Sequence, residues 1–193
     1  MSSSSRFYNA FSFVYPLIDR LLGGHKELLA QKANALPGEK LLEVGVGNGS
    51  GLQFYKAKSI TGIDTSEGML DAAQAKNPDC TFLVMDGTSM AFDNACFDIV
   101  VMSHVLAVVP HPAKMLSESW RVLKPGGHLL VLNHFTPKGP LGWMDKAFSP
   151  FSRLLHFKSA FYFEKLDFSA FGLQEIIKCG KFGYFKLVIL RKP

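Results

Sequence analysis

The sequence of 193 residues is poor in cysteine. Its three cysteines, Cys80, Cys96 and Cys179, form no CxxC pair, and an odd, scattered set argues against both a disulfide framework and a zinc site. Such cysteine usage fits a reducing cytosol. We therefore expect no metal and a core held by apolar packing. A single domain of this length buries about 70% of the surface that its unfolded chain exposes.

Membrane signals are also missing from the sequence. The N-terminal stretch MSSSSRFYNAFSF has no basic segment followed by an apolar core, so it does not predict a secretory signal. The longest apolar run, residues 99–110, has about half of the ~20 residues that a membrane-spanning helix needs. We expect a cytoplasmic protein, and the net charge of +5 and 17 phenylalanines leave peripheral contact with an anionic inner membrane face open.

Between residues 37 and 135, apolar runs without strict alternation are separated by segments of helical pattern. This order predicts a parallel sheet that is covered on both faces. Strands are expected at 40–46, 59–64, 80–86, 97–103 and 128–135. Helices are expected at 66–76, with Thr65 or Ser66 as N-cap, and at 112–123, and a short helical stretch is expected between residues 50 and 57.

The flanks of this core differ from it. Residues 6–36 have helical spacing and predict two helices, because Gly23 and Gly24 interrupt the pattern. Residues 136–165 are aromatic and basic, and residues 166–193 predict two strands joined by a turn. We predict one α/β domain, a Rossmann-like, doubly wound, mostly parallel seven-stranded sheet with an antiparallel C-terminal strand. Its expected parts are a helical part (1–36), the core (37–135), an aromatic and basic insert (136–165) and C-terminal strands (166–193).

A glycine-rich turn, LLEVGVGNGSGL, follows the first expected strand at residues 41–52. The dinucleotide fingerprint GxGxxG fails in both registers, because its third glycine would fall on Ser50 or on Leu52, and no GK[ST] follows. Glu43 stands two residues before Gly45. Its carboxylate would repel a pyrophosphate but would attract an ammonium or a sulfonium group. The turn therefore predicts a ligand with a positive charge.

Two further acids follow the next two strands. Asp64 ends the second strand, 19 residues after Gly45, where a carboxylate can bind both ribose hydroxyls. Asp86 closes the third strand, where a carboxylate can accept a hydrogen bond from an adenine amino group. Either acid alone is more often a solvated strand end or a cap. Together with Glu43 and the glycines, they predict an adenosine with a cationic tail.

The stretches LLEVGVGNGSG, ITGIDTSEGML, MDGTSMAFDNACFDIVVMSHVLAVVPHP and SESWRVLKPGGHLLVLNHF resemble the successive motifs of class I S-adenosylmethionine-dependent methyltransferases. The resemblance covers residues 40–135 and implies S-adenosyl-L-methionine as cofactor. It also implies that residues 37–135 are a cofactor-binding core and that residues 1–36 form a helical roof over the site. It also implies a binding residue set: Glu43, Gly45, Gly47 and Gly49 for the methionine part, Asp64 with Thr65 for the ribose, Asp86, Gly87 and Thr88 for the adenine, and Ser103 and His104 after the fourth strand. Met69 either packs against the adenine, as in the family, or is an ordinary core methionine.

Within this group, the stretches LEVGVGNG, HVLAVVPHPAKM, LVLNHF and GYFKLVILRKP resemble the bacterial phosphatidylethanolamine N-methyltransferases. This resemblance implies a phospholipid acceptor at a membrane surface. The aromatic and basic flanks favour the same acceptor, although they also fit an ordinary lid with a solvated face. Quinone-biosynthesis C-methyltransferases share the cofactor half, so C- or O-methylation of a quinone or another apolar molecule remains an alternative. A non-catalytic adenosyl- or membrane-binding module is another, and no motif supports nucleic acid.

An amine acceptor has to lose a proton before it attacks, so the acceptor end needs a base. The candidates for the catalytic end are Tyr15 in the roof, Asn133 and His134 at the end of the fifth strand, and Tyr184 in the last hairpin, and His104 after the fourth strand is also expected near the methyl group. We expect His134 to accept the proton, although a lone histidine at a strand end is more often structural. Arg153 or Lys146 is expected to anchor a lipid phosphate.

Overall fold

The computed structural model describes residues 15–135, 166, 168–180 and 184–193, and the side chains of its first helix from residue 24 onward. The chain order of the described elements is α2 (Tyr15–Asn34), β1 (Lys40–Val44), η1 (Leu52–Phe54), β2 (Ser59–Asp64), α3 (Glu67–Lys76), β3 (Thr81–Val84), β4 (Phe97–Ser103), α4 (Pro112–Val122), β5 (Leu123–His134), η3 (Ser169–Phe171), β6 (Leu173–Cys179) and β7 (Phe185–Arg191).

The strands form one seven-stranded sheet in the order β3-β2-β1-β4-β5-β7-β6. Strands β1 to β5 pair in parallel, whereas β7 runs antiparallel to both β5 and β6. The central strands are apolar on both faces, since β1 is buried after its first residue and β4 over most of its length. This confirms the predicted fold class, because such strands need a cover on each side.

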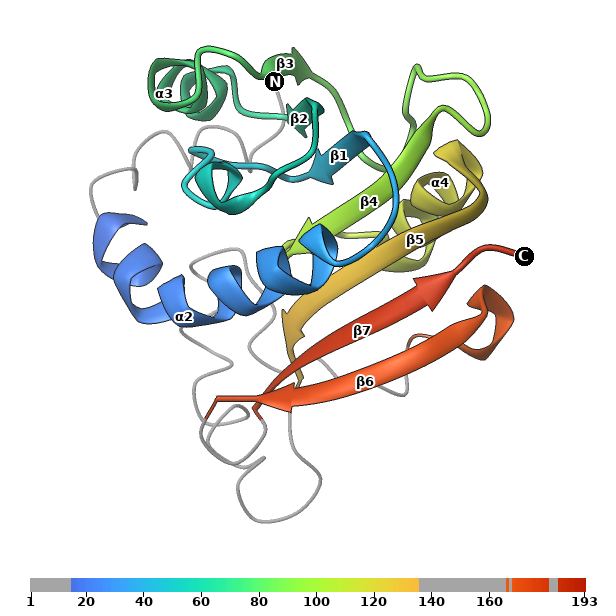
Figure 1. The fold of residues 1–193 in the computed structure, drawn as a ribbon. Helices are drawn as coiled ribbons and strands as arrows, with labels where there is room; N and C mark the ends of the chain where they lie inside the picture. Colours follow the sequence, from blue (N-terminus) through green and yellow to red (C-terminus); the bar gives the residue numbers. More distant parts are fainter. Residues whose placement is uncertain (1–14, 136–165, 167, 181–183) are drawn as a thin grey trace.

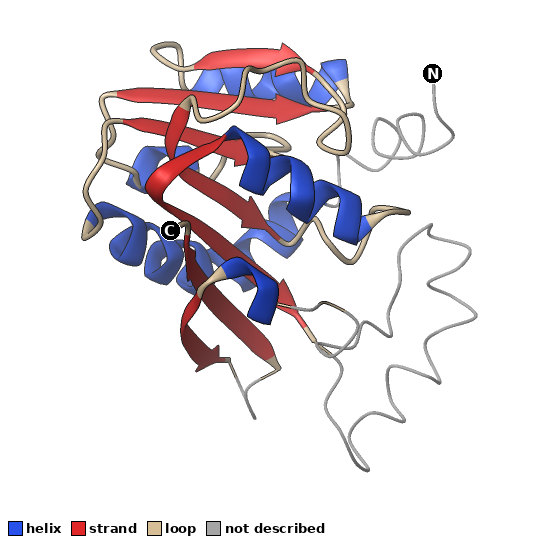
Figure 2. Ribbon diagram, turned by 90° about the vertical axis from the view of Figure 1, so that its right-hand side faces the viewer, coloured by secondary structure: helices blue, strands red, loops and turns tan. Residues whose placement is uncertain are grey.

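Helices cover the two faces of the sheet (Figures 1 and 2). On one face, α2 packs Leu29, Ala30 and Ala33 against alternate side chains of β1, β4, β5 and β7, and η1 and α3 join this cluster. On the other face, α4 packs Met115 and Leu116 against the intervening side chains. Leu29 and Leu116 are almost completely buried. The carboxyl ends of the parallel strands are left facing the loops.

Several element boundaries differ from the sequence-based expectation. α2 runs unbroken through Gly23 and Gly24, so the prediction of two helices was wrong. Packing of the helix on the sheet outweighs the roughly 1 kcal/mol that each glycine costs. β5 begins at Leu123 rather than at residue 128, and β3 ends at Val84, so Asp86 lies beyond its strand. Of the two expected caps, Ser66 is the one that accepts from Met69 N.

In the part of the chain that the structure describes, no helix is long and apolar enough to cross a membrane. The insert at 136–165 and the first 14 residues lie outside that part, so their predicted roles as roof and lid stay predictions. The same holds for the proposed division of the domain into four parts.

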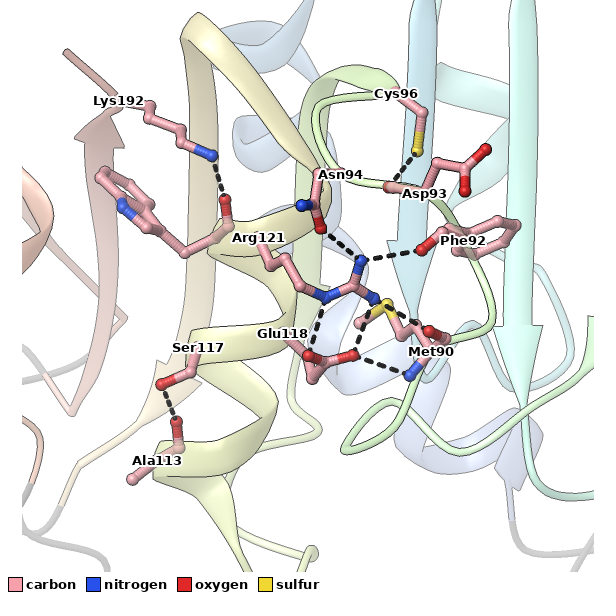
Figure 3. A network of polar contacts seen from close by, with 11 residues as sticks. Met90, Phe92, Asp93, Asn94, Cys96, Ala113, Ser117, Glu118, Arg121 and Lys192 are labelled. Carbon is pink, nitrogen blue, oxygen red and sulfur yellow. Dashed lines mark hydrogen bonds and ion pairs between the residues drawn. The ribbon is translucent and has the colours of Figure 1, made fainter.

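The loop that follows Asp86 is held to α4 by Arg121 (Figure 3). The guanidinium donates to the backbone oxygens of Met90 and Phe92, at 2.9 and 2.8 Å, and to Asn94 Oδ1 at 2.9 Å. Both remaining donors engage the carboxylate of Glu118 at 2.9 Å. Because five donors in a rigid fork match five acceptors, only arginine can satisfy this loop.

We expect Arg121→Lys to lower the free energy of unfolding by about 2 kcal/mol, because a lysine leaves part-buried carbonyls without donors. Urea denaturation checks this, with Lys114→Met, an exposed change on the same helix, as control. Equal denaturation midpoints for Arg121→Lys and the wild-type protein would show that the network adds little.

Candidate functional site

The candidate site lies at the carboxyl ends of β1 and β4. From β1 the chain winds outward to β2 and β3, then returns to place β4 on the other side of β1. In open α/β sheets, ligands bind at such a reversal of strand order. The turns after the two strands touch, since a Cβ added to Gly45 would lie 2.5 Å from Val105 Cγ2. Any side chain at Gly45 would separate these turns.

The glycine turn is packed against its neighbours at Gly45 and Gly49, whereas its backbone is open at Gly47. Gly45 N donates to Ile63 O at 2.8 Å, which ties the turn to β2. Gly49 is packed against α3, where Asn77 Nδ2 donates to its oxygen at 3.1 Å. Gly47 has a φ of +55° and no heavy atom within 4 Å of a Cβ built on it. The backbone at Gly47 can therefore be approached closely by a ligand.

Glu43 is buried beneath this turn, with 5% of its surface exposed. Burial raises the pKa of its carboxyl group to about 7, and the nearby positive charge of Lys26 opposes that rise. Oε2 has no hydrogen-bond partner among the described residues. An unsatisfied buried carboxylate costs stability, and a cationic ligand would supply the missing partner. This agrees with the charge expected from the sequence.

Asp64 ends β2 and ties the turn to α3. Its Oδ2 accepts from Gly47 N and its Oδ1 from Ser66 N, both at 3.0 Å. Burial raises the pKa of this carboxyl group, and the hydrogen bonds from backbone amides oppose the rise. The backbone of Thr65 also donates to this carboxylate, which leaves at least one of its roughly four lone-pair positions for another donor. Asp64 can therefore accept further hydrogen bonds from a ligand beside Gly47.

The three residues after β3 form a tight turn. Asp86 is exposed, and its Oδ1 accepts from Thr88 N at 2.7 Å. Gly87 is buried, and an added Cβ would lie 2.6 Å from Val44 Cγ1. This contact seats the turn against the end of β1. Of the two other predicted residues on the adenine and ribose side, Met69 is buried in α3 with its N–H capped, whereas Thr65 is exposed.

Ser103 and His104 follow β4, as predicted. Ser103 Oγ is buried and has no hydrogen-bond partner among the described residues. His104 has a φ of +58°, in the left-handed region, and its N–H donates to Leu132 O at 2.7 Å. Such a conformation costs a non-glycine residue about 1 kcal/mol, and backbone strain of this kind concentrates at functional sites.

Five rings meet at the same edge of the sheet, and we call them the ring cluster. Phe185, at the start of β7, contacts three of them, with centroid distances of 4.4 Å to His25, 5.5 Å to His104 and 5.2 Å to Tyr184. Tyr184 in turn stacks on His134 at 5.7 Å, with an interplanar angle of 12°. Segments that are far apart in sequence thus contribute to one cluster of rings at this edge of the sheet.

The structure brings together only some of the predicted catalytic residues. His134 and Tyr184 are in contact, but Asn133 alternates with His134 along β5 and belongs to the opposite face of the sheet. Asn133 is fully buried, and its Nδ2 donates to His134 O at 2.9 Å. The side chain of Tyr15 and all of Lys146 and Arg153 lie outside the described part. Sequence reasoning missed His25 and Lys26, because no motif marks them.

Comparison with known proteins now decides the family. Residues 42–131 match the model of a methyltransferase domain. The chain is 37% identical over 137 residues to a phosphatidylethanolamine N-methyltransferase of Cereibacter sphaeroides. This alignment spans 67% of this chain and 68% of that protein. The chain is a class I S-adenosylmethionine-dependent methyltransferase. The members of this family are enzymes, so the comparisons favour a catalytic protein over a non-catalytic binding module.

Other relatives of this methyltransferase differ in their acceptors. It is 34% identical over 114 residues to a demethylmenaquinone methyltransferase of Renibacterium salmoninarum, an alignment that spans 58% of this chain and 48% of that protein. A solved SAM-dependent methyltransferase of Thermotoga maritima shares the fold, with a TM-score of 0.74 and 21% identity over 97% of this chain and 99% of that one. The cofactor is S-adenosyl-L-methionine.

The residues of the methyltransferase site fit this cofactor. Its methionine end carries an ammonium and a sulfonium, which match the charge of Glu43, whose Oε2 has no partner in the described part of the chain. The open backbone at Gly47 leaves room for that end to approach.

We expect Glu43→Gln to stabilise the cofactor-free protein at pH 8 and to have little effect at pH 5. Folding raises the pKa of Glu43 from its unfolded value of 4.5. The contribution of this group to the free energy of unfolding is therefore most favourable below pH 4.5 and falls as the pH rises towards 7. Above pH 7 the buried charge costs about 3 kcal/mol, which glutamine avoids. The same variant should bind S-adenosylmethionine at least ~10-fold more weakly.

Urea denaturation at pH 5 and pH 8, together with calorimetric binding, measures both effects. Glu39→Gln is the control, because Glu39 is exposed and pairs with Lys58 at the surface. An identical difference in stability between Glu43→Gln and wild type at both pH values would contradict the buried charge.

Proposed function

We propose that this methyltransferase transfers methyl groups to the amino headgroup of phosphatidylethanolamine, in successive steps, at the surface of a membrane. The observation that carries the proposal is the 37% identity with the Cereibacter enzyme, which extends over 137 residues. The net charge of +5 supports it, because a basic protein is attracted to anionic lipid surfaces.

The cofactor is held, in this proposal, by the residues that surround the glycine turn. Glu43 binds the ammonium of the methionine end, and Asp64 binds the ribose hydroxyls next to Gly47. The adenine lies against the turn of Asp86, Gly87 and Thr88. Two observations support this placement: Glu43 Oε2 lacks a partner among the residues that the structure describes, and Asp64 Oδ2 accepts from Gly47 N at 3.0 Å.

The ring cluster suits the headgroup of such a lipid. Aromatic faces attract methylated ammonium groups by about 0.5–2 kcal/mol. Burial among them also disfavours the charged form of the incoming amine, whose pKa in water is about 10.4 for a lysine-like group. The ring cluster would therefore help to bind the methylated product and to keep the substrate amine deprotonated, in particular through His25, His104 and Phe185.

S-adenosylmethionine supplies a methyl group that is activated on sulfur, so the protein has to align the acceptor and remove its proton. The amine lone pair would form the new N–C bond as the C–S bond breaks, which would leave the sulfur as a neutral thioether. We assign the released proton to His134, which Tyr184 holds by stacking. Asn133 is a positioning residue, because it donates to the backbone oxygen of His134.

A second candidate is C-methylation of a quinone. The similarity to the Renibacterium demethylmenaquinone methyltransferase favours it, and flat quinone rings also stack on aromatic side chains. Such an acceptor would not require the removal of an ammonium proton.

Incubation with methyl-labelled S-adenosylmethionine and a total lipid extract distinguishes the two candidates. We expect the label in mono-, di- and trimethylated phosphatidylethanolamine. With phosphatidylethanolamine vesicles, the rate should rise when an anionic lipid is added, since basic residues gain about 1 kcal/mol each near such a surface. Label found only in the quinone fraction would refute the phospholipid proposal.

Replacement of His134 by alanine tests the proton acceptor. We expect kcat with phosphatidylethanolamine to fall about 100-fold and the acidic limb of its pH profile to disappear, with unchanged cofactor affinity. His111→Ala, a change of an exposed histidine before α4, is the control. If His134→Ala keeps both the rate and the pH profile of the wild type, His134 is not the base.

A further inference from the structure

Helix α2 brings a lysine to the glycine turn, although the two segments share no motif. Lys26 Nζ lies 2.7 Å from Ser50 Oγ. The aliphatic part of the same side chain lies along the turn, since a Cβ built on Gly51 would be 3.7 Å from Lys26 Cδ. The ammonium is thus held above the turn by a contact between residues 24 positions apart.

Lys26 and Glu43 flank the same glycine. The Cβ position of Gly51 is 4.0 Å from Glu43 Oε1, on the residue whose other oxygen has no partner among the described residues. The two charges influence each other, because Lys26 lowers the pKa that burial raises at Glu43. An ammonium and a carboxylate therefore stand side by side at the turn that opens at Gly47.

We propose that Lys26 binds the carboxylate of the methionine end of S-adenosylmethionine while Glu43 binds its ammonium. The inference rests on the proposed placement of that end at Glu43. An amino acid zwitterion presents one negative and one positive group on a single carbon, and the Lys26–Glu43 pair presents the opposite charges. An ammonium has three donors, so Lys26 keeps Ser50 as a partner and still donates to a carboxylate.

The role of Lys26 gives α2 a function beyond covering the sheet. The helix packs Leu29 and Ala33 on the core. Lys26, one to two helical turns before them, places a positive charge at the glycine turn. The site would then select ligands with an intact amino acid end. Adenosine derivatives without a carboxylate would lose the contact to Lys26 and keep those to the rest of the site.

A ligand that lacks only the carboxylate tests the proposal directly. Binding of S-adenosylmethionine and of decarboxylated S-adenosylmethionine is measured by calorimetry for wild type, Lys26→Met and Lys26→Arg. We expect Lys26→Met to weaken the binding of S-adenosylmethionine about 10- to 100-fold. The affinity for decarboxylated S-adenosylmethionine should stay within about twofold of the wild-type value. Lys26→Arg should restore part of the loss, because it keeps the charge.

Lys32→Met is the matched control. Lys32 is on the same helix but forms an exposed ion pair with Glu175 of β6, at 3.1 Å. This variant should bind both ligands as the wild type does. Urea midpoints of all variants show whether α2 remains packed.

If Lys26→Met weakens both ligands equally, or neither, the role of Lys26 is refuted. These measurements need no acceptor, so they stand even if the lipid proposal fails in the labelling experiment. Normal binding of S-adenosylmethionine by Glu43→Gln would instead refute the placement of the methionine end, on which the inference depends.

Discussion

The buried carboxylate of Glu43 is the constraint around which this methyltransferase site is built. It is the last but one residue of β1, where Leu41, Leu42 and Val44 are apolar and buried, and one of its oxygens has no partner among the described residues. Burial raises its pKa to about 7, so near neutral pH the group is poised between its charged and neutral forms. Such a group weakens the fold, and the ammonium of the cofactor would compensate for this cost in the placement that we propose.

The surrounding loops hold the glycine turn in place and leave the backbone at Gly47 open. Gly45 and Gly49 allow the turn to pack on Val105 and on α3, and Asp64 fixes the amide of Gly47. Lys26 completes the turn from α2. On the far side, Arg121 holds the loop after Asp86 to α4. These contacts hold the turns on the cofactor side in place, and the ring cluster, where we propose that the acceptor binds, is assembled from α2, β5, the start of β7 with the preceding Tyr184, and the turn after β4.

Much of this arrangement could be predicted from sequence because it depends on local patterns. The apolar run of β4 correctly predicted its bounds, Phe97–Ser103. The alternation of strands and helices predicted parallel strands, and it therefore predicted Glu43 and Asp64 near the same edge of the sheet. The continuity of α2 could not be predicted, because packing overrides the local preference of Gly23 and Gly24. His25 and Lys26 were missed for a related reason. Their partners Phe185 and Ser50 are distant in sequence, so only the fold brings them together.

The proton balance of cofactor binding tests the central role of Glu43 most directly. At pH 6, a carboxyl group with a pKa of about 7 is mostly protonated in the cofactor-free protein, whereas the ammonium of the ligand is already charged. Calorimetry of S-adenosylmethionine binding in buffers of different ionisation enthalpy should therefore show release of nearly one proton at pH 6, and no release from Glu43→Gln. Tight binding by the wild type at pH 6 without proton release would contradict the account.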